Sequence, residues 1–372
     1  MRVALVINTS WNIWNFRASL VRALQAAGHE VLAIAPPDAY SGRLETELGC
    51  RYVPILMENK GTNPVKDAAL MRRFYQIYRR EKPDVVLHYT IKPNIYGSIA
   101  ARLAGVPSIN NVSGLGTVFI IQNFVSKVAL GLYRFAFRFP SKVFFQNNDD
   151  RQLFLEHGLV RPEITGLLPG SGVDIRWFQP AGAFRRQKPF VFLMVARVLY
   201  EKGVAEYFEA ARRLQAAFGP EQVRVQLLGG LDEAGGVGVP RATFEKWLEG
   251  GEIEYLGHSD NVVAHLHAAD CVVLPSYREG TPKTLLEAAA CGKPIVTTDV
   301  PGCRETVVDG RNGYLCQVRS GEDLAAKMRQ VYALSDADLA EMGQASRRLA
   351  ETKFDEQLVL HQYLDAVAAV RR

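Results

Sequence analysis

The stretch from Cys271 to Gly292 restricts the possible folds more than any other part of the sequence. It begins with the apolar run Cys271–Leu274, the pattern of a strand buried in a parallel sheet. A proline then breaks the strand, and a helix is predicted from Thr281 and Pro282, which suit the cap and the first turn. Gly292 is predicted to end that helix. This order is typical of an open α/β sheet, which binds ligands beside the carboxyl ends of its strands.

Two glutamates, Glu279 and Glu287, stand on either side of the predicted start of this helix. Glu279 falls in the loop after the strand, and Glu287 falls within the helix, about one to two turns further along. The free amides and the dipole of a helix N-terminus attract anions at this place. Two solvated glutamates are the alternative interpretation of the spacing, but the strand, turn and capped helix around it favour a binding site.

The length of 372 residues predicts two domains of ordinary size. The five cysteines form no Cys-x-x-Cys pair and fit buried free thiols in a reducing compartment. The first residues read as a strand rather than a signal peptide, and no apolar run approaches the ~18 residues of a membrane-spanning helix, so we expect a cytoplasmic protein. A net charge of +5 suits an anionic substrate or a membrane surface but is too small to indicate nucleic acid.

The first half of the chain opens like a Rossmann domain. Residues 2–8 and 29–35 have the apolar pattern of buried strands. A polar loop over 9–15 and a helix over 16–27 are predicted between them, which gives a βαβ start. No Gly-x-Gly-x-x-Gly follows the first strand, so we expect no dinucleotide cofactor there.

A second series of the same kind begins with the strand pattern at 190–196. The turn-rich stretch 170–187 before it predicts the domain boundary. We therefore expect an α/β protein with one Rossmann-like domain over 1–175 and a second over 176–354.

Polar residues follow three successive strands of the first half, at the point where each strand is predicted to end. Because the carboxyl ends of parallel strands meet at one edge of a sheet, these residues are predicted to form one rim of a cleft. For any single residue a capped loop is an equally good explanation, and a lone histidine at a strand end is usually structural. The candidates are Asn8, Ser10, Asn12, Arg17, His88, Lys92, Asn111 and Ser113.

In the second half, Arg197 and Lys202 stand five residues apart across a predicted strand end and helix start. Their cations and the backbone amides from Gly280 to Thr284 could face one diphosphate. A diphosphate leaving group gains negative charge in the transition state, so preformed positive groups would stabilise its departure. Two surface cations are the alternative, and the glutamates of the same domain favour the functional interpretation.

The segment 119–139 is rich in apolar and aromatic residues, and its only charges are Lys127, Arg134 and Arg138. Steps of seven and four residues place these cations on one side of a helix. This is the pattern of a helix that lies in the interface of an anionic membrane. A core helix with three cations that extend to solvent is the alternative, and both interpretations stay open.

Taken together, the motifs of the chain are similar to those of the retaining, nucleotide-sugar-dependent glycosyltransferases of the family-four type. The resemblance covers nearly the whole sequence and implies the GT-B fold, in which two Rossmann-like domains face a central cleft. The motifs that carry it are Gly172-Val-Asp174, Ala196-Arg197, Glu201-Lys-Gly203, Leu256-Gly257 and the span from Glu279 to Glu287.

The resemblance implies a role for each residue on the donor side. Arg197 and Lys202 would hold the nucleotide diphosphate, Glu279 would contact the hydroxyls of the donor sugar, and Glu287 would contact the ribose. Transfer would proceed with retention and without a metal ion or other cofactor, and a C-terminal helix, about 355–372, would pack back on the first domain. The other donor-binding candidates are Gly229, His258, Gly280, Thr281, Pro282, Lys283 and Thr284.

The first half is most similar to enzymes that extend undecaprenyl-diphosphate-linked sugars, and among them to transferases of N-acetylgalactosamine. This likeness rests on residues 8–17, 92–97 and 111–116. The rim residues named above would then bind a polyprenyl-diphosphate glycan acceptor. The family's Gly-Gly loop is replaced by one that begins at Ser10, and its frequent His-Gly by Ser113 and a glycine, so no histidine is assigned to the reaction.

These observations give the hypothesis of a retaining glycosyltransferase that works peripherally on the cytoplasmic face of the membrane. It would use a UDP-sugar, for which we expect a UDP-N-acetylhexosamine, and the donor's own β-phosphate would take the proton of the attacking hydroxyl. Two alternatives stay open: a sugar-nucleotide epimerase of similar architecture and a non-catalytic UDP-sugar-binding protein. An epimerase would need acid–base groups, for which His88 is the only candidate, and the full donor set argues against a non-catalytic protein.

Overall fold

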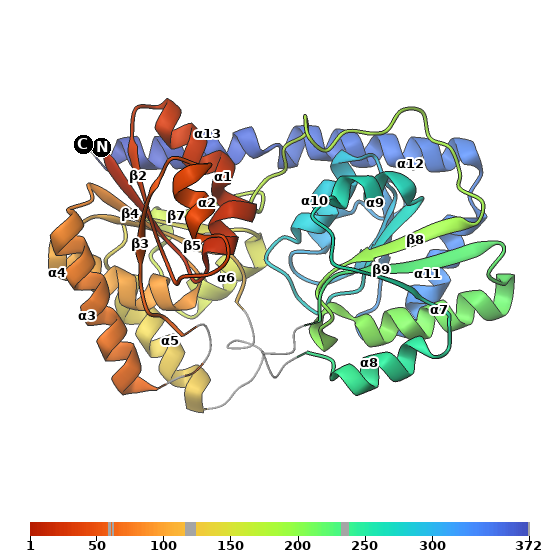
Figure 1. The fold of residues 1–372 in the computed structure, drawn as a ribbon, viewed down its shortest axis with the longest axis horizontal. Helices are drawn as coiled ribbons and strands as arrows, with labels where there is room; N and C mark the ends of the chain where they lie inside the picture. The colour runs from red at the N-terminus through yellow and green to blue at the C-terminus, as the bar shows by residue number, and fades with distance from the viewer. Residues whose placement is uncertain (59–60, 62, 116–123, 232–237, 371–372) are drawn as a thin grey trace. The chain divides into compact units, whose positions relative to one another are not determined.

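The structure is a computed structural model and describes residues 1–58, 61, 63–115, 124–231 and 238–370. The chain divides into two compact units. Unit 1 consists of Met1–Ser171 with Gln357–Arg372, and unit 2 consists of Gly172–Glu356. Each unit is built on a parallel sheet covered by helices (Figure 1), as the sequence predicts.

The sheet of unit 1 has the strand order β3-β2-β1-β4-β5-β6-β7, and each neighbouring pair is parallel. The order of the strands reverses between β1 and β4, which marks the point where open α/β sheets bind ligands. The strands are β1 Arg2–Val6, β2 Glu30–Ala35, β3 Arg51–Pro54, β4 Val85–Tyr89, β5 Ser108–Val112, β6 Lys142–Phe145 and β7 Thr165–Leu167.

Successive residues of β1 alternate between the two faces of this sheet. Val3 and Leu5 pack with α1, α2 and α13, and Ala4 and Val6 pack with α3 and α4 (Figure 1). The C-terminal helix α13 therefore completes the core of unit 1. The helical segments of this unit are α1 Ser10–Ala26, α2 Ser41–Thr46, α3 Pro64–Glu81, η1 Pro93–Gly97, α4 Ser98–Ala104, α5 Phe124–Ala136, α6 Asn148–Glu156, η3 Pro162–Ile164 and α13 Glu356–Ala369.

The polar loop predicted over 9–15 is wrong, because α1 already begins at Ser10. Thr9 is extended, and its hydroxyl accepts a hydrogen bond from the amide of Asn12 at 3.1 Å. This side-chain cap satisfies one of the free amides of the first turn, so the helix forms earlier than its apolar pattern indicates.

The sheet of unit 2 has the order β10-β9-β8-β11-β12-β13, again with parallel neighbours, and its order reverses between β8 and β11. Helices α7 and α11 pack together on one face, and α10 and α12 pack together on the other (Figure 1). The strands are β8 Phe190–Val195, β9 Val223–Leu228, β10 Glu254–Gly257, β11 Cys271–Leu274, β12 Ile295–Thr298 and β13 Gly313–Cys316.

Helix α10 follows β11 as predicted, but it begins at Lys283, with Pro282 as its cap. The hydroxyl of Thr281, the predicted cap, instead donates to the carbonyl of Gly280 at 2.9 Å. The helical segments of unit 2 are η4 Tyr200–Lys202, α7 Val204–Phe218, α8 Arg241–Leu248, α9 Val262–Ala268, α10 Lys283–Ala290, η5 Arg304–Thr306, α11 Gly321–Ala333, α12 Asp336–Leu349 and η6 Ala350–Phe354.

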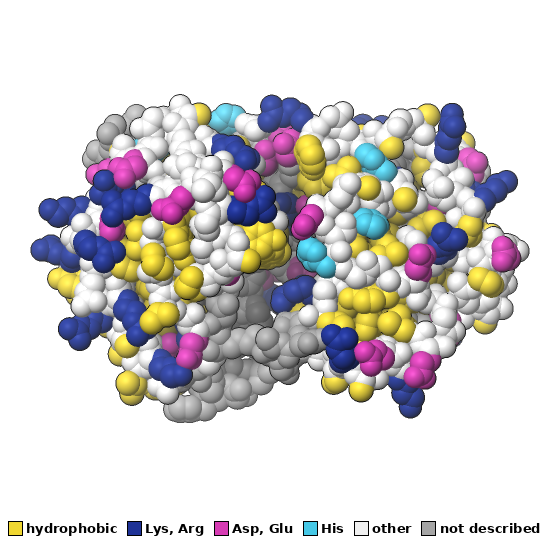
Figure 2. Space-filling view, viewed as in Figure 1, with side chains coloured by type: hydrophobic (Ala, Val, Ile, Leu, Met, Phe, Trp, Pro, Cys, Tyr) yellow, Lys and Arg dark blue, Asp and Glu magenta, His cyan; other side chains and the backbone are white. Residues whose placement is uncertain are grey.

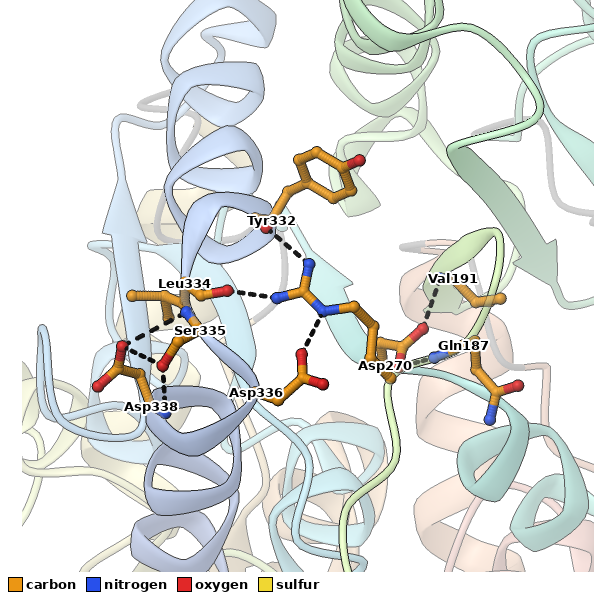
Figure 3. Close-up of polar contacts among 9 residues, drawn as sticks. Gln187, Val191, Asp270, Tyr332, Leu334, Ser335, Asp336 and Asp338 are labelled. Atoms are coloured by element: carbon orange, nitrogen blue, oxygen red, sulfur yellow. Dashed lines mark hydrogen bonds and ion pairs between the residues drawn. The ribbon is translucent and has the colours of Figure 1, made fainter.

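The segment that leads into β8 is fixed at two points (Figure 3). The buried carboxylate of Asp270 accepts hydrogen bonds from the amides of Gln187 and Val191, both at 2.8 Å. The guanidinium of Arg186 donates to the carbonyls of Tyr332 and Leu334 and pairs with Asp336 at 2.8 Å. The first strand of unit 2 is thus held in register by polar contacts as well as by its apolar side chains.

Glycine is required where the turn after β8 meets the turn after β11. Gly203 has a φ of +73°, and a Cβ placed on it would lie 2.1 Å from the carbonyl oxygen of Pro275. Any side chain at this position would push the two turns apart, because a backbone carbonyl cannot move as a flexible side chain does.

We expect Gly203→Ala to lower the free energy of unfolding by more than about 3 kcal/mol, since it adds a backbone clash to the cost of a left-handed residue. Gly251→Ala is the matched control: its φ is +74°, and a Cβ at this position would meet no atom within 4 Å. That control should lose only about 1–2 kcal/mol. Urea denaturation of both variants measures the difference, and equal losses would contradict the assigned clash.

Candidate functional site

The donor-side residues predicted from the sequence meet at the carboxyl edge of the unit 2 sheet. Arg197 follows β8, Gly229 follows β9, His258 follows β10 and Glu279 follows β11. The amide of Gly229 donates to the carbonyl of Gly257 at 2.7 Å, which ties the ends of β9 and β10 together. Arg197 and His258 are both exposed at this edge.

Three consecutive residues join the turn after β8 to the turn after β11. The carbonyl of Glu201 accepts the amide of Tyr277 at 2.9 Å, and the α-carbon of Gly203 lies against Pro275. Between them, the ammonium group of Lys202 pairs with Oε1 of Glu279 at 2.5 Å. The structure therefore brings together two residues that stand far apart in the sequence, on the two sides of the strand-order reversal.

Glu279 is held in one orientation. Its Oε1 accepts hydrogen bonds from Lys202 and from the buried hydroxyl of Ser276, the latter at 2.8 Å. Its amide donates to the carbonyl of Pro301 at 3.2 Å. Because both side-chain donors use the same oxygen, the second carboxylate oxygen is left to accept a hydrogen bond from a ligand.

The N-terminus of α10 lies directly after this loop, and the amides of its first turn have no carbonyl partner within the helix. Thr284 stands in the first turn of the helix, and its hydroxyl oxygen is buried without a hydrogen-bond partner among the residues that the structure describes. A buried polar atom of this kind costs free energy unless a ligand or water satisfies it. The helix dipole, the free amides and this hydroxyl together favour a phosphate group at this place.

Glu287 lies further along α10, and its side chain is only 13% exposed. Burial raises the pKa of this carboxyl to about 7, although the ammonium group of Lys283, 3.8 Å away, acts in the opposite direction. Near neutral pH the protonated and the ionised form of the Glu287 carboxyl are therefore both populated. It can accept a hydrogen bond from a ligand hydroxyl when ionised and donate one when protonated.

In unit 1 the predicted rim residues are connected through two aromatic rings. The guanidinium of Arg17 lies over the ring of Tyr89, 4.5 Å from its centroid, and that ring lies 6.1 Å from the ring of Tyr363. The Tyr363 hydroxyl accepts a hydrogen bond from the amide of Asn111 at 2.6 Å, and Asn111 accepts one from Ser113 at 2.9 Å. These contacts span the carboxyl ends of β4 and β5, as well as α1 and α13.

The structure places His88 in the core rather than at this rim. The side chain is 0% exposed and lies between the hydroxyl of Tyr78, 2.9 Å from Nε2, and the amide oxygen of Asn110, 3.0 Å from Nδ1. Burial lowers its pKa to about 4, so the ring is neutral and both nitrogens are occupied. His88 therefore cannot contact an acceptor in this arrangement, which corrects the expectation for this residue.

Two further rim candidates are occupied by other contacts. Lys92 pairs with the buried carboxylate of Asp67 at 2.8 Å. The hydroxyl of Ser10 is buried against the carbonyl of Pro36 and the hydroxyl of Ser41, at 3.2 and 3.0 Å. These contacts position the start of α1 and the loop after β4. Asn111 is likewise buried and bonded through both side-chain groups, so Asn8, Asn12, Arg17 and Ser113 are the rim residues that a ligand could meet.

Four residues of these clusters were not singled out from the sequence: Tyr89, Ser276, Gly302 and Tyr363. Ser276 follows a predicted strand end, which is the signal that could have found it. Gly302 allows close packing behind Glu279, because a Cβ there would lie 2.4 Å from the Glu279 carbonyl. Tyr363 lies in a C-terminal helix, and its contact with Asn111 spans most of the chain, so no local pattern indicates it.

The predicted membrane segment 119–139 is described only in part, since residues 119–123 lie outside the described residues. Helix α5 buries Tyr133 and Ala136 in the core of unit 1, and Phe137 of the turn that follows is buried there too. Val128 and Phe135 are each 47% exposed on its other side. The cations Lys127, Arg134 and Arg138 are also exposed. Among the described residues, no helix combines the length and apolar character needed to cross a bilayer.

Comparison with known proteins gives family matches for both halves of the chain. Residues 13–170 match the glycosyl transferase 4-like domain, and residues 175–349 match the glycosyl transferases group 1. The chain is 28% identical to an N,N'-diacetylbacillosaminyl-diphospho-undecaprenol alpha-1,3-N-acetylgalactosaminyltransferase of Campylobacter jejuni, over 98% of this chain and 97% of that one. It is also 28% identical to a UDP-Gal:alpha-D-GlcNAc-diphosphoundecaprenol alpha-1,3-galactosyltransferase of Escherichia coli, over 74% and 72% of the two chains.

Solved structures share the fold over nearly the whole chain. The HepE protein of Anabaena in complex with UDP and glucose superposes with a TM-score of 0.81 at 20% identity, and covers 99% of this chain and 100% of that one. Sucrose-phosphate synthase from Thermosynechococcus elongatus gives a TM-score of 0.82, also at 20% identity, with the same coverage.

The pKa of Glu287 leads to a prediction about stability and pH. Below about pH 4.5 the carboxyl is protonated in both the folded and the unfolded chain, and between about 4.5 and 7 only the unfolded chain loses the proton. Wild-type folding therefore becomes less favourable across this window, by up to the order of 3 kcal/mol. Glu287→Gln should gain stability relative to wild type over the same window and keep a constant advantage above it.

Urea denaturation of the two proteins between about pH 5 and pH 8 measures this difference. Lys283 is unchanged in the variant, so its own charge cancels in the comparison. Parallel stability curves for the two proteins would show that burial does not raise the pKa of Glu287.

Proposed function

Because the chain belongs to the group 1 glycosyltransferases with a glycosyltransferase 4-like first domain, and has their GT-B fold, we propose that it transfers a sugar from a UDP-sugar to a polyprenyl-diphosphate-linked glycan. The Lys202–Glu279 pair beside the N-terminus of α10 is the observation that carries this proposal. Both curated relatives described above act on diphospho-undecaprenol-linked sugars, which supports the same class of acceptor. The product would enter the assembly of a cell-surface polysaccharide or glycan.

On the donor side, the diphosphate would bind at the N-terminus of α10 with Lys202 and Arg197 as its cations. As the bond between sugar and phosphate breaks, negative charge grows on the leaving diphosphate. A preformed cation or amide stabilises this charge more in the transition state than in the bound donor, by typically about 3 kcal/mol for each group. No metal ion or cofactor is assigned a role, since these groups already supply positive charge at the leaving oxygens.

Glu279 would orient the donor sugar through its second carboxylate oxygen, and Glu287 would contact the ribose. The proposed transfer retains the configuration of the sugar carbon, and the donor's β-phosphate takes the proton of the attacking hydroxyl. The relative from Campylobacter jejuni transfers N-acetylgalactosamine, and the HepE structure holds UDP, so a UDP-N-acetylhexosamine is our proposed donor.

On the acceptor side, the rim residues Asn8, Asn12, Arg17 and Ser113 of unit 1 would meet the lipid-linked glycan, and Asn111 would position Tyr363 and Ser113. A peripheral position on the cytoplasmic membrane surface follows from a lipid acceptor, and α5 is the proposed contact. Its exposed Val128 and Phe135 would enter the apolar boundary, and its exposed cations would face anionic headgroups. Lys and Arg side chains also gather over the side of unit 1 where α3 and α4 lie (Figure 2), which suits the same surface.

The test is transfer itself. Purified protein is incubated with each of a panel of radiolabelled UDP-sugars and with an undecaprenyl-diphosphate-linked monosaccharide, and the lipid product is separated. We expect one UDP-N-acetylhexosamine to label the lipid, and the anomeric configuration of the product to match the donor. Release of an isomerised sugar nucleotide without acceptor, or donor binding without turnover, would contradict the proposal.

Removing either member of the central pair should stop catalysis without unfolding the protein. We expect Glu279→Ala to abolish transfer, and Lys202→Ala to lower kcat by about 10²- to 10³-fold, since it removes a cation from the leaving group. Lys246→Ala is the matched control, because Lys246 is exposed on α8 of the same unit. Steady-state kinetics and circular dichroism measure activity and fold, and wild-type turnover in Glu279→Ala would remove its assigned role.

The membrane contact has its own test. Phe135→Glu should lower binding to vesicles that contain anionic phospholipid by at least about tenfold, because it puts a charge where an aromatic ring would enter the membrane. Leu358→Glu is the control on α13, since this leucine is 42% exposed but lies outside α5 and outside the basic side of α3 and α4. Co-sedimentation with vesicles measures binding, and an equal loss in both variants would speak against α5 as the contact.

A further inference from the structure

Arg17 is a buried cation that has no carboxylate partner among the described residues. The residue is 5% exposed, and its Nη1 donates to the carbonyl of Phe16 at 3.0 Å. Its Nε is buried and makes no hydrogen bond in the part of the chain that the structure describes. Within the same residues, no Asp or Glu forms an ion pair with it. The ring of Tyr89 beneath it is the one charge-compensating contact described for this guanidinium.

A buried guanidinium without a carboxylate partner, as in Arg17, lowers the stability of the unliganded protein. A buried charge needs a partner of opposite sign and enough hydrogen bonds, and a cation–π contact replaces these only in part. The guanidinium has five donors in a planar fork, which matches the oxygens of a phosphate. An anion with several oxygens would satisfy the donors that the protein leaves unused.

The position of Arg17 in the fold points to the same ligand. It lies in the second turn of α1, which follows β1, and Tyr89 is the last residue of β4. The strand order of unit 1 reverses between β1 and β4, where open α/β sheets bind their ligands. Helix α1 carries no acidic residue in its first turn, so its N-terminus adds positive potential.

Further polar side chains lie at the carboxyl ends of β1 and β5 in this unit. The side-chain oxygen of Asn8, two residues after β1, is buried without a partner among the described residues, and as an acceptor it suits a hydroxyl of the glycan rather than the diphosphate. Tyr363 of α13 packs beside Tyr89 and accepts a hydrogen bond from Asn111. Asn111 and Tyr363 therefore position the ring on which Arg17 rests, and do not themselves need to touch the ligand.

We propose that Arg17 binds the diphosphate of the lipid-linked acceptor, with Tyr89 as its platform and Tyr363 and Asn111 as positioning residues. This assignment rests on the proposed function for the identity of the ligand, and on the unpaired guanidinium for the presence of an anion site. It divides the two diphosphates between the units: the donor's is bound by unit 2 and the acceptor's by unit 1. The enzyme would then distinguish a diphosphate-linked acceptor from a neutral glycan through one residue.

The kinetic test compares Arg17→Gln with Arg22→Gln, a control on the exposed side of the same helix. We expect Arg17→Gln to raise the KM for the undecaprenyl-diphosphate-linked sugar by about 10- to 100-fold, because a charged bidentate contact is lost. The KM of Arg17→Gln for the UDP-sugar should stay within about twofold of the wild-type value. For Arg22→Gln, the KM values for both the acceptor and the UDP-sugar should stay within the same range. A rise confined to the UDP-sugar KM, or no change in either, would overturn the assignment.

A second measurement does not depend on turnover. In the presence of saturating UDP, inorganic pyrophosphate should raise the thermal midpoint of wild type and Arg22→Gln but not that of Arg17→Met. Without pyrophosphate, Arg17→Met should be at least as stable as wild type, because it removes an uncompensated buried charge. Loss of stability in Arg17→Met would show a structural role instead.

The two experiments separate the two proposals. Protein that transfers no sugar, yet loses its pyrophosphate response with Arg17→Met, would remove the proposed function and leave the anion site in place. If the wild type transfers sugar but Arg17→Gln keeps the wild-type KM for the acceptor, the proposed function stands and the anion site at Arg17 is refuted.

Discussion

The ion pair between Lys202 and Glu279 is the contact on which the candidate site of unit 2 depends. It joins the loops after β8 and β11, the two strands between which the strand order reverses. The residues on both sides of Lys202 are also held in place: Glu201 accepts a backbone hydrogen bond from Tyr277, and Gly203 packs against Pro275. The backbone that carries Lys202 therefore cannot move far without disturbing both turns. The two side chains are 17% and 15% exposed, so water screens the pair only in part.

The pair also sets the charge of the site before any ligand arrives. Lys202 is partly neutralised by Glu279, so in the proposed function additional positive charge for a diphosphate would come from the N-terminus of α10 and from Arg197 at the same edge. Glu287 adds a carboxyl whose pKa is raised to about 7 by burial, so it brings less than a full negative charge near neutral pH. A site with two glutamates can therefore accept an anionic donor, because one carboxylate is paired and the other is partly protonated.

The fold and the placement of the candidate residues at one edge of the unit 2 sheet were predictable because they follow from local pattern. The apolar run of β11, the glycine that ends α10 and the glutamates around its start are adjacent in sequence, and the parallel sheet brings equivalent loops to one edge. The start of α1 was missed because its cap is one hydroxyl, Thr9, rather than an apolar repeat. His88 was misplaced for a different reason: a polar residue at a strand end can turn inward when Tyr78 and Asn110 satisfy both ring nitrogens. Tyr363 could not be found, since its contact with Asn111 joins opposite ends of the chain.

Each unit carries a cation in the segment that follows its first strand, but the surroundings of the two cations differ. In unit 2 the cation after the first strand, Lys202, has a carboxylate within 2.5 Å and needs no ligand to be stable. In unit 1 the cation after the first strand, Arg17, has an aromatic ring beneath it and no carboxylate in the described part of the chain. A paired cation can be shared with a leaving group as charge develops, which suits catalysis. An unpaired one gains its full stabilisation when an anion binds, which suits recognition of a charged substrate in its ground state.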